Sequence, residues 1–152
     1  MAHFAFDLRT GASPDAVWEA LTDFSERRPD LWPGLPRPMY EVYEVGETSA
    51  DVREGYRGPI WVRERYDWSV PGRVVWTAAE SGFAMPGKTV TATIKPDPVG
   101  GGSIVHLTWD GTGKGLFGKF FVGFMALTRG YFIRRSVQSG LDRVEALSAN
   151  QD

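Results

Sequence analysis

Two glutamates and two tyrosines stand out in this sequence, because their spacing places all four on one face of two neighbouring predicted strands. Period-two alternation puts Glu54 beside Tyr56 on the first strand and Glu64 beside Tyr66 on the second. The turn at 57–59, with the sequence Arg-Gly-Pro, joins the two strands, so we expect the two carboxyl groups to lie close together. The opposite faces carry more charge, which favours a register that turns the glutamates inward.

Carboxyl groups crowded into a poorly solvated site can take part in acid–base catalysis. The crowding raises the pKa of at least one of them, which suits a general acid or base. We therefore interpret Glu54 and Glu64 as candidate catalytic residues, with Tyr56, Tyr66 or an inward arginine polarising a carbonyl oxygen. Two alternatives stay open: each glutamate pairs with an arginine for structural reasons, or the edge of the hairpin is solvated.

Other chemistry-bearing motifs are excluded by their pattern. His3 and His106 occupy outward positions of predicted strands, so neither a His/carboxylate metal site nor a nucleophile–histidine pair is expected. The chain has no cysteine, which excludes disulfides and thiolate catalysis. The glycine-rich segment 111–115 lacks the leading glycine of a phosphate loop, and Gly115 stands where Ser or Thr would be required, so we interpret it as a hinge. We expect no metal and no cofactor.

Composition narrows the class of protein. A length of 152 residues suits one domain over 1–152, and 42% hydrophobic with 24% charged residues is typical of a globular protein. A net charge of −2 with both signs interspersed gives no reason to expect a nucleic-acid partner. The sequence shows neither a signal-peptide pattern nor an apolar run near the roughly 20 residues of a transmembrane segment, so we expect a cytoplasmic protein.

The order of predicted elements follows from periodicity and turn residues. Alternation at 3–9 predicts a half-buried strand, and Ser13 followed by Pro14 predicts a helix that ends near Phe24. Four prolines in 28–38 leave room for only a short helical turn. Turn residues then separate six predicted strands, at Met39–Val45, Ser49–Tyr56, Ile60–Val70, Arg73–Glu80, Lys88–Lys95 and Ser103–Gly113.

One long helix is predicted from Gly115 to about Ala149, and it completes an α+β fold. Consecutive strands joined by short turns form an antiparallel meander, with the helices gathered on one face. We therefore predict a curved seven-stranded antiparallel sheet wrapped around a long C-terminal helix, with two short helices after the first strand.

The predicted long helix changes character along its length. At about 100° per residue, one face carries Gly123, Ala126, Gly130, Ile133, Val137, Leu141 and Val144. The first three are small and the last four are large, so the N-terminal half stands off the sheet and leaves room for a ligand. Glycine in a helix costs about 0.5–1 kcal/mol relative to alanine, and a ligand would explain that cost. Close backbone packing without a cavity is the alternative.

The other side of the same half of the helix is also apolar. It carries Phe117, Phe120, Phe121, Phe124, Met125 and Phe132. A patch this apolar is unusual on the surface of a monomer, and three coverings are open: the protein itself, a second subunit in a homodimer, or weak contact with a membrane surface.

Three stretches of the chain carry a resemblance to a known family. The first is Ser13-Pro14 with Val17-Trp18, Leu21 and Asp23, the second is Leu31-Trp32-Pro33-Gly34, and the third is the strand from Trp61 to Trp68 running into Pro71-Gly72-Arg73 before the final helix. In these features the sequence resembles the START-like, polyketide cyclase/dehydrase-type proteins with the helix-grip fold of the birch-pollen allergen. The resemblance implies a cavity between sheet and helix. It implies no catalytic set, since members range from lipid carriers to cyclases.

We therefore predict a domain that binds an apolar, ring-containing or lipid-like small molecule between the sheet and the C-terminal helix. Tyr56 and Tyr66 would line the site with Glu54 and Glu64. The expected walls are Trp68, Trp76, Ile94, Leu107, Trp109, Phe120, Gly123, Phe124, Leu127 and Gly130. The first rival is a cyclase or dehydratase that uses the two carboxylates as acid and base on a polyketide-like or enone substrate. The second is a protein-interaction module that uses the aromatic helix face.

Overall fold

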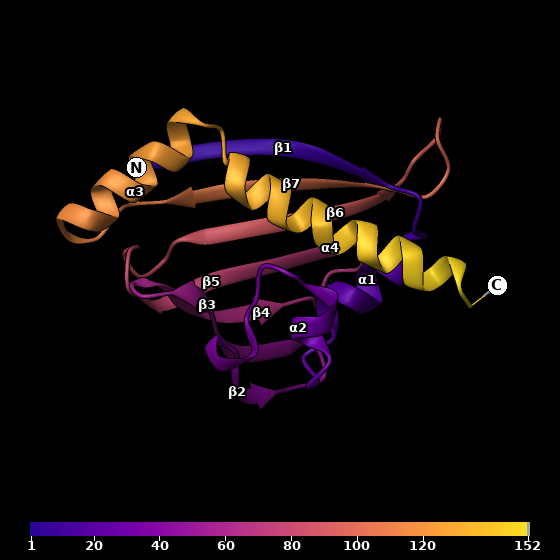
Figure 1. The fold of residues 1–152 in the computed structure, drawn as a ribbon, viewed down its shortest axis with the longest axis horizontal. Coiled ribbons are helices and arrows are strands. Elements are labelled where there is room, and N and C mark those ends of the chain that lie inside the picture. The colour runs from indigo at the N-terminus through magenta and orange to yellow at the C-terminus, as the bar shows by residue number, and fades with distance from the viewer. Residues whose placement is uncertain (152) are drawn as a thin grey trace.

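The computed structural model describes residues 1–151, which form seven strands, four α-helices and one short 3-10 helix (Figure 1). The strands are β1 Ala2–Thr10, β2 Glu41–Val45, β3 Ser49–Arg57, β4 Ile60–Asp67, β5 Arg73–Ser81, β6 Thr89–Pro96 and β7 Ser103–Gly111. The helices are α1 Pro14–Thr22, α2 Arg28–Leu31, α3 Gly115–Leu127 and α4 Tyr131–Ala149, with the 3-10 helix η1 at Arg37–Met39.

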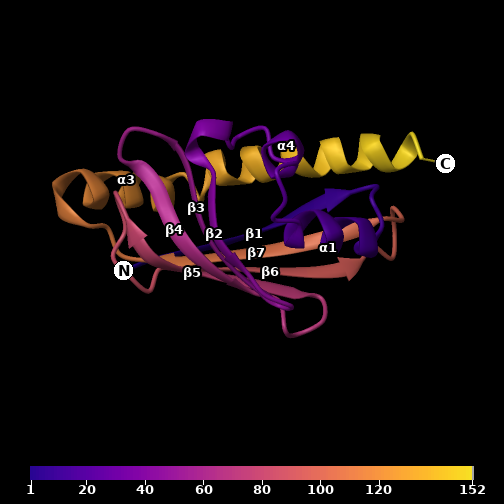
Figure 2. The ribbon, with the colours of Figure 1, turned by 90° about the horizontal axis from the view of Figure 1, so that it is seen from below.

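The strands form one antiparallel sheet in the order β1-β7-β6-β5-β4-β3-β2. The meander from β2 to β7 is sequential, and β1 returns beside β7, where Phe4 pairs with Trp109. Figure 2 shows the sheet curving beneath α4, with β3 and β4 rising beside the helix. The predicted α+β class, strand number, order and antiparallel pairing are confirmed.

The segment between β1 and β2 holds the two short helices that were predicted. Ser13 is the N-cap of α1, its hydroxyl accepting a hydrogen bond from the Ala16 amide at 3.1 Å, and Pro14 occupies the first turn. After α2 the chain crosses α4, where Trp32 packs on Gly140 so closely that a Cβ there would lie 2.2 Å from the indole ring. Gly140 therefore lets this segment lie directly on the C-terminal helix.

The prediction of one unbroken helix from Gly115 to Ala149 is wrong. The chain forms two helices, α3 and α4, with a bend of 69° between them. Arg129 and Gly130 both adopt left-handed backbone angles, with φ of 52° and 70°, and end the helical path. A Cβ at Gly130 would lie 2.3 Å from the Phe4 ring, so contact with β1 sets the break. Apolar periodicity continued across this point and therefore gave no sign of it.

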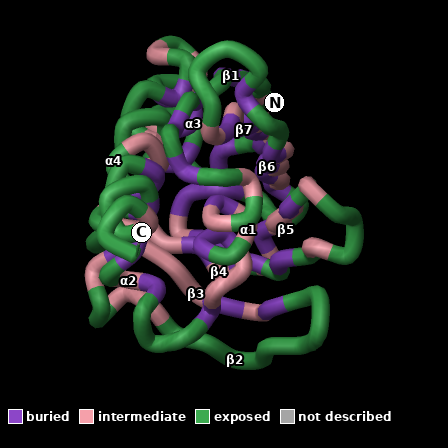
Figure 3. Tube along the Cα trace, turned by 90° about the vertical axis from the view of Figure 1, so that its right-hand side faces the viewer, coloured by how far each residue is buried: buried purple, intermediate pink, exposed green. Residues whose placement is uncertain are grey.

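Buried residues alternate along β1, β6 and β7, so they share the inner face of the sheet. Figure 3 shows these strands with buried segments in purple. α4 covers this face with the predicted large side chains, since Leu141 and Val144 are buried and Ile133 and Val137 pack partly against the core. The short outer strand β2 is exposed along its whole length. The core therefore lies between α4 and the central strands.

Candidate functional site

A cavity of about 270 Å³ lies between the inner face of the sheet, α4 and the segment 28–35. Aromatic and aliphatic side chains make up most of its walls, and the aromatic ones include Trp32 from the chain above the sheet and Trp76 from β5. Leu107 of β7 and Val137 of α4 add aliphatic surface. The predicted space between sheet and helix therefore exists, and it lies beneath α4.

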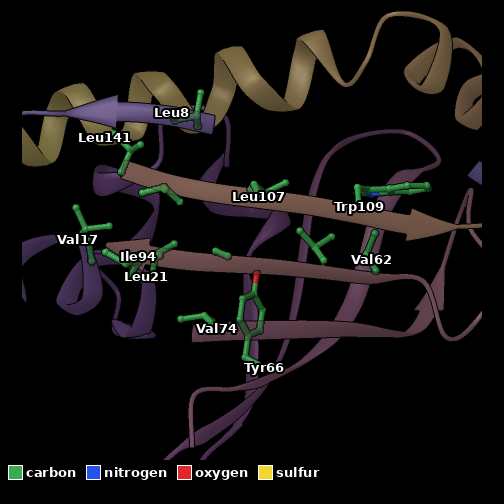
Figure 4. Close-up of a cluster of buried hydrophobic side chains, with 14 of the residues drawn as sticks. Leu8, Val17, Leu21, Val62, Tyr66, Val74, Ile94, Leu107, Trp109 and Leu141 are labelled. Atoms are coloured by element: carbon green, nitrogen blue, oxygen red, sulfur yellow. The ribbon is translucent and has the colours of Figure 1, made fainter. Parts of the chain in front are cut away.

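Polar side chains gather at one end of this cavity around the hydroxyl of Tyr66. The hydroxyl donates a hydrogen bond to Glu54 Oε2 at 2.8 Å, and Glu64 Oε2 lies 3.4 Å from it as a second, longer acceptor. Arg28 Nη2 donates a hydrogen bond to the Tyr66 hydroxyl oxygen at 3.4 Å. Figure 4 shows Tyr66 among the buried side chains, with Trp109 at a separate place on the inner face. Tyr66 thus connects two carboxylates and one guanidinium.

Arg28, the first residue of α2, is buried and donates hydrogen bonds to four acceptors, one of which is the Tyr66 hydroxyl. Its Nε donates to Glu54 Oε1 at 2.5 Å, and its Nη1 donates to the carbonyl oxygens of Leu21 and Asp23 at 3.3 and 3.1 Å. Burial is the largest single influence on the pKa of Arg28, and it lowers that pKa. The negative charge of Glu54 and the Tyr66 hydroxyl together outweigh burial, so the pKa is raised overall. Arg28 therefore stays charged at the end of the cavity.

Glu64 is the most deeply buried acid of this group, with 4% of its surface exposed. Burial raises its pKa, Lys88 opposes that rise through an ion pair, and the nearby charge of Glu54 adds to it. Burial also raises the pKa of Tyr66 well above its usual range, and Glu54 and Glu64 add to the rise. Tyr66 therefore remains a protonated hydrogen-bond donor.

The predicted inward register of both glutamates is the register of the structure, but their surroundings differ. Glu54 lines the cavity, whereas Glu64 lies behind Tyr66 and pairs with Lys88. The two strands pair with Val52 opposite Glu64 and Glu54 opposite Val62, so the carboxyl groups meet only through the tyrosine. The structural pairing left open from the sequence is present, with Arg28 as the partner of Glu54.

Two members of this cluster, Arg28 and Lys88, were absent from the predicted site. Lys88 did carry a signal, because it continues the inward alternation of Val90, Ala92 and Ile94 by one step. Arg28 carried none, because it lies in a proline-rich segment with no periodicity to assign it a face. Its position is set by the packing of α2 against α4.

Four of the predicted wall residues line the cavity: Tyr56, Tyr66, Trp76 and Leu107. Three others lie in the packed core or, in the case of Trp68, pack against it. Trp68 stacks on Phe24 with 5.5 Å between ring centroids, Trp109 stacks on Phe4 at 5.2 Å, and Ile94 is buried on β6. The walls also include many residues that were not predicted, among them the aromatic side chains of Trp32, Trp61 and Phe83 and the aliphatic side chain of Leu35.

The predicted walls on the N-terminal half of the helix lie away from the cavity. Phe120, Gly123, Phe124 and Leu127 face solvent on the outer side of α3, and Gly130 sits at the break between the helices. The reason is the bend, because α3 turns aside and buries its other face, made of Gly118, Val122 and Met125. The expectation that small residues on α3 open space for a ligand does not match this arrangement.

The histidines and the glycine-rich segment behave as structural elements. His3 and His106 lie on the outer face, each with Nδ1 at 2.5 Å from a carboxylate, of Asp110 and Asp7 respectively. Across residues 1–151, no group of three histidine, aspartate or glutamate side chains is placed to hold a metal ion. Gly115 leads from β7 into α3 with a φ of 65°, a left-handed conformation that favours glycine, and its interpretation as a hinge stays a prediction.

Within the described chain, no single helix is long and apolar enough to cross a membrane. Only α3 and α4 taken together have the required length and composition, and the 69° bend separates them. The cytoplasmic location stays a prediction.

Solved structures with the same fold extend over the full length of the described chain. The protein TTHA0849 from Thermus thermophilus has a TM-score of 0.69 and 20% identity, covering 97% of this chain and 98% of its own. A START superfamily protein from Mycobacterium smegmatis has a TM-score of 0.65 and 12% identity, covering 97% and 99%. The di-domain ARO/CYC protein StfQ from the steffimycin biosynthetic pathway has a TM-score of 0.70 and 14% identity, covering 99% of this chain and 51% of that one.

Identities this low establish the fold, and it is the helix-grip fold that the resemblance implied. No curated protein matches the chain. The family described as polyketide cyclase/dehydrase and lipid transport matches residues 1–149, nearly the whole chain, and the protein belongs to that family.

Proposed function

We propose that the protein binds an apolar, ring-containing small molecule that carries at least one hydrogen-bonding oxygen. The observation that carries the proposal is the cavity of about 270 Å³, with aromatic and aliphatic walls and a polar end formed by Arg28, Glu54 and Tyr66. Pockets that bind small molecules combine apolar walls with a few well-placed polar groups in this way. The family description, which spans cyclases, dehydrases and lipid transport, supports the same ligand class.

The polar end offers one donor that is less committed than the others. Arg28 uses Nε on Glu54 and Nη1 on two backbone carbonyls, while its Nη2 contacts only the Tyr66 oxygen, at 3.4 Å. A ligand oxygen placed near Nη2 would accept a charge-assisted hydrogen bond there, which orients a flat ring system along the tryptophan walls. The ligand would enter with its apolar part against Trp32 and Trp76.

A cyclase or dehydratase that uses Glu54 as acid or base is the second candidate function. It is favoured by the position of Glu54, whose carboxylate lines the cavity beside a tyrosine that is held protonated. Di-domain ARO/CYC proteins of biosynthetic pathways share the fold. Against this role, Glu54 is already occupied by Arg28 and Tyr66, so a proton transfer would have to break a buried ion pair. Binding is therefore the function we put first.

Ligand binding is tested by titrating intrinsic tryptophan fluorescence with naphthol and with methylnaphthalene, which differ in one hydroxyl group. We expect both to quench the fluorescence of Trp32, Trp61 and Trp76, with tighter binding of naphthol. Val137→Phe places extra bulk in the cavity and should weaken both ligands by about tenfold. Ile133→Phe, one turn earlier on α4, is the matched control. Equal weakening by both variants, or no quenching at all, would argue against a ligand cavity.

Native mass spectrometry of the protein as purified supplies a direct test of occupancy. A retained apolar molecule at one per chain supports binding and identifies the compounds to test for turnover. The Glu54→Gln and Glu64→Gln variants then separate the two functions. A binding protein keeps most of its affinity in both, whereas an enzyme that depends on either acid loses about 10²–10⁴ in rate.

A further inference from the structure

The outer face of α3, which we define as Leu116, Phe120, Gly123, Phe124 and Leu127, is apolar and open to solvent. Leu116, Phe120 and Leu127 are 89%, 74% and 83% exposed. At about 100° per residue, the five positions fall within one arc of about 100° on the helix. Contiguous exposed apolar patches on soluble proteins mark interaction sites, whereas scattered single residues do not.

The helix cannot rotate to bury this face. Its opposite side carries Gly118, which packs on the backbone of Phe83, and a Cβ there would lie 2.1 Å from the Phe83 carbonyl oxygen. Gly113 packs on the backbone of Gly118, where a Cβ on Gly113 would lie 2.4 Å from the Gly118 carbonyl oxygen. Met125 and Val122 are buried on the same side. Close backbone contacts therefore hold the apolar face outward.

The charged residues of the segment 114–135, which contains α3, all have one sign. Five basic residues and no acidic residue lie in 114–135, while the remaining twelve basic residues and all 19 acidic residues lie elsewhere. The five are Lys114, Lys119, Arg129, Arg134 and Arg135, and all five are exposed. A protein with a net charge of −2 thus has only positive charges in the segment that contains its most exposed apolar helix.

We propose that the outer face of α3 docks onto the surface of an anionic lipid bilayer. The helix would lie in the membrane plane, with Leu116, Phe120 and Leu127 among the acyl chains and the surrounding cations against the phosphate groups. A second copy of the chain fits this surface less well. A twofold contact would bring the same cations together with no acidic residue of this segment to pair with them.

The position of α3 fits such docking. The helix forms one end of the molecule, opposite the C-terminal end of α4 (Figures 1 and 2). Two further exposed rings, Tyr131 and Phe132, extend the apolar surface onto the start of α4. On its inner side, Phe121 contacts Phe83 at 5.0 Å between ring centroids, and Phe83 lines the cavity. Docking rests on the surface alone and does not require a ligand in the cavity.

The proposal is tested by co-sedimentation with vesicles of phosphatidylcholine and with vesicles of equal parts phosphatidylcholine and phosphatidylglycerol. We expect binding to the second composition that weakens as salt is raised. The double variant Phe120→Gln/Leu127→Gln should weaken it at least about tenfold. Val99→Gln is the matched control, because Val99 is 87% exposed in the β6–β7 turn and should bind as the parent does. Circular dichroism checks that the variants fold alike.

Charge is tested separately with Lys119→Glu, which should weaken binding to the anionic vesicles by about fivefold or more. Lys95→Glu, an exposed lysine on β6, should leave binding unchanged. Absence of binding to the anionic vesicles, equal binding to both compositions, or equal losses in the control variants would each overturn the proposal. A dimer in sedimentation velocity that Phe120→Gln/Leu127→Gln disperses would overturn it too, in favour of a second copy of the chain.

Discussion

The two ends of the inner sheet face follow the same alternation but contain different chemistry. At the β1–β7 end, Phe4 and Trp109 stack on each other and fill the interior with apolar rings. At the β3–β4 end, Glu54, Glu64 and Tyr66 occupy inward positions and adjoin the cavity. An inward position therefore does not by itself produce a dry, filled core.

The difference lies in what the rest of the chain brings to each end. At the charged end, Arg28 of α2 pairs with Glu54, and Lys88, the residue just before β6, pairs with Glu64, so each carboxylate meets a cation. Buried charges persist only when they are paired and hydrogen-bonded. The pairs hold these side chains in fixed positions, and together with the segment 28–35 above the sheet they border a space that side chains do not fill.

The largest expected effect is at the filled end. Trp109→Ala removes a fully buried ring and its stack on Phe4, and should lower the free energy of unfolding by about 5 kcal/mol, the top of the range for such substitutions. Urea denaturation measures the change. A loss below about 2 kcal/mol would show that this end repacks easily and is less different from the cavity end than the structure indicates.

Breaking the ion pair between Lys88 and Glu64, at the cavity end, should cause the second-largest loss of stability. Lys88→Met leaves Glu64 buried without its cation and should lower the free energy of unfolding by about 3 kcal/mol. Adding Glu64→Gln to it removes the uncompensated charge and should recover part of the loss. Lys95→Met, at an exposed position of β6, is the control and should change the free energy of unfolding by less than about 0.5 kcal/mol. A double variant less stable than Lys88→Met alone would contradict this interpretation.

Removing the hydroxyl that connects the polar groups should have a smaller effect on stability and a distinct effect on binding. Tyr66→Phe takes a donor from Glu54 and should cost about 1.5–3 kcal/mol in urea denaturation. The preference for naphthol over methylnaphthalene should also shrink, because Arg28 loses the oxygen that helps to position it. An unchanged preference would place the ligand oxygen elsewhere in the cavity.

The smallest expected effect is a pH dependence that distinguishes the two ends. The pKa of Glu64 is higher in the folded protein than its ordinary value of about 4.3, so the folded state binds that proton more tightly than the unfolded state does. Stability from this group therefore falls as pH rises from the ordinary value through the raised pKa. Glu64→Gln should flatten the curve in that window. Parallel curves for the parent and the variant would show that Glu64 titrates normally.

Three aspartates have lowered pKa values, so their contribution to stability changes with pH in the opposite direction to that of Glu64 and at lower pH. Hydrogen bonds hold the pKa of Asp51, Asp67 and Asp97 below its usual range, through Arg63, Ser69 and the amides of Val99 and Gly100 respectively. Their contribution is present above the usual aspartate pKa and is lost as pH falls through their folded pKa values. The pH range in which Glu64 changes the stability therefore lies above the range in which the aspartates change it. One series of stability measurements against pH can separate the two contributions.

Local patterns were sufficient for the strands, for the N-cap at Ser13 and for the inward faces of β3 and β4. Each of these depends on residues a few positions apart, and alternation or capping shows them directly. The same alternation, carried back one step from Val90, would also have placed Lys88 inside. These features account for the fold class, the strand order and, once Lys88 is included, every member of the polar cluster except Arg28.

The sequence by itself determined which side chains face inward from the sheet and that apolar residues run along the C-terminal segment. Only the tertiary structure decided that Arg28 reaches Glu54, that the helix breaks at Gly130, and that Phe120 and Leu127 face solvent. The physical reason is that these outcomes depend on contacts between distant parts of the chain. The Phe4 ring excludes a side chain at 130, and the backbone of Phe83 fixes the rotation of α3. No periodicity within a single segment contains that information.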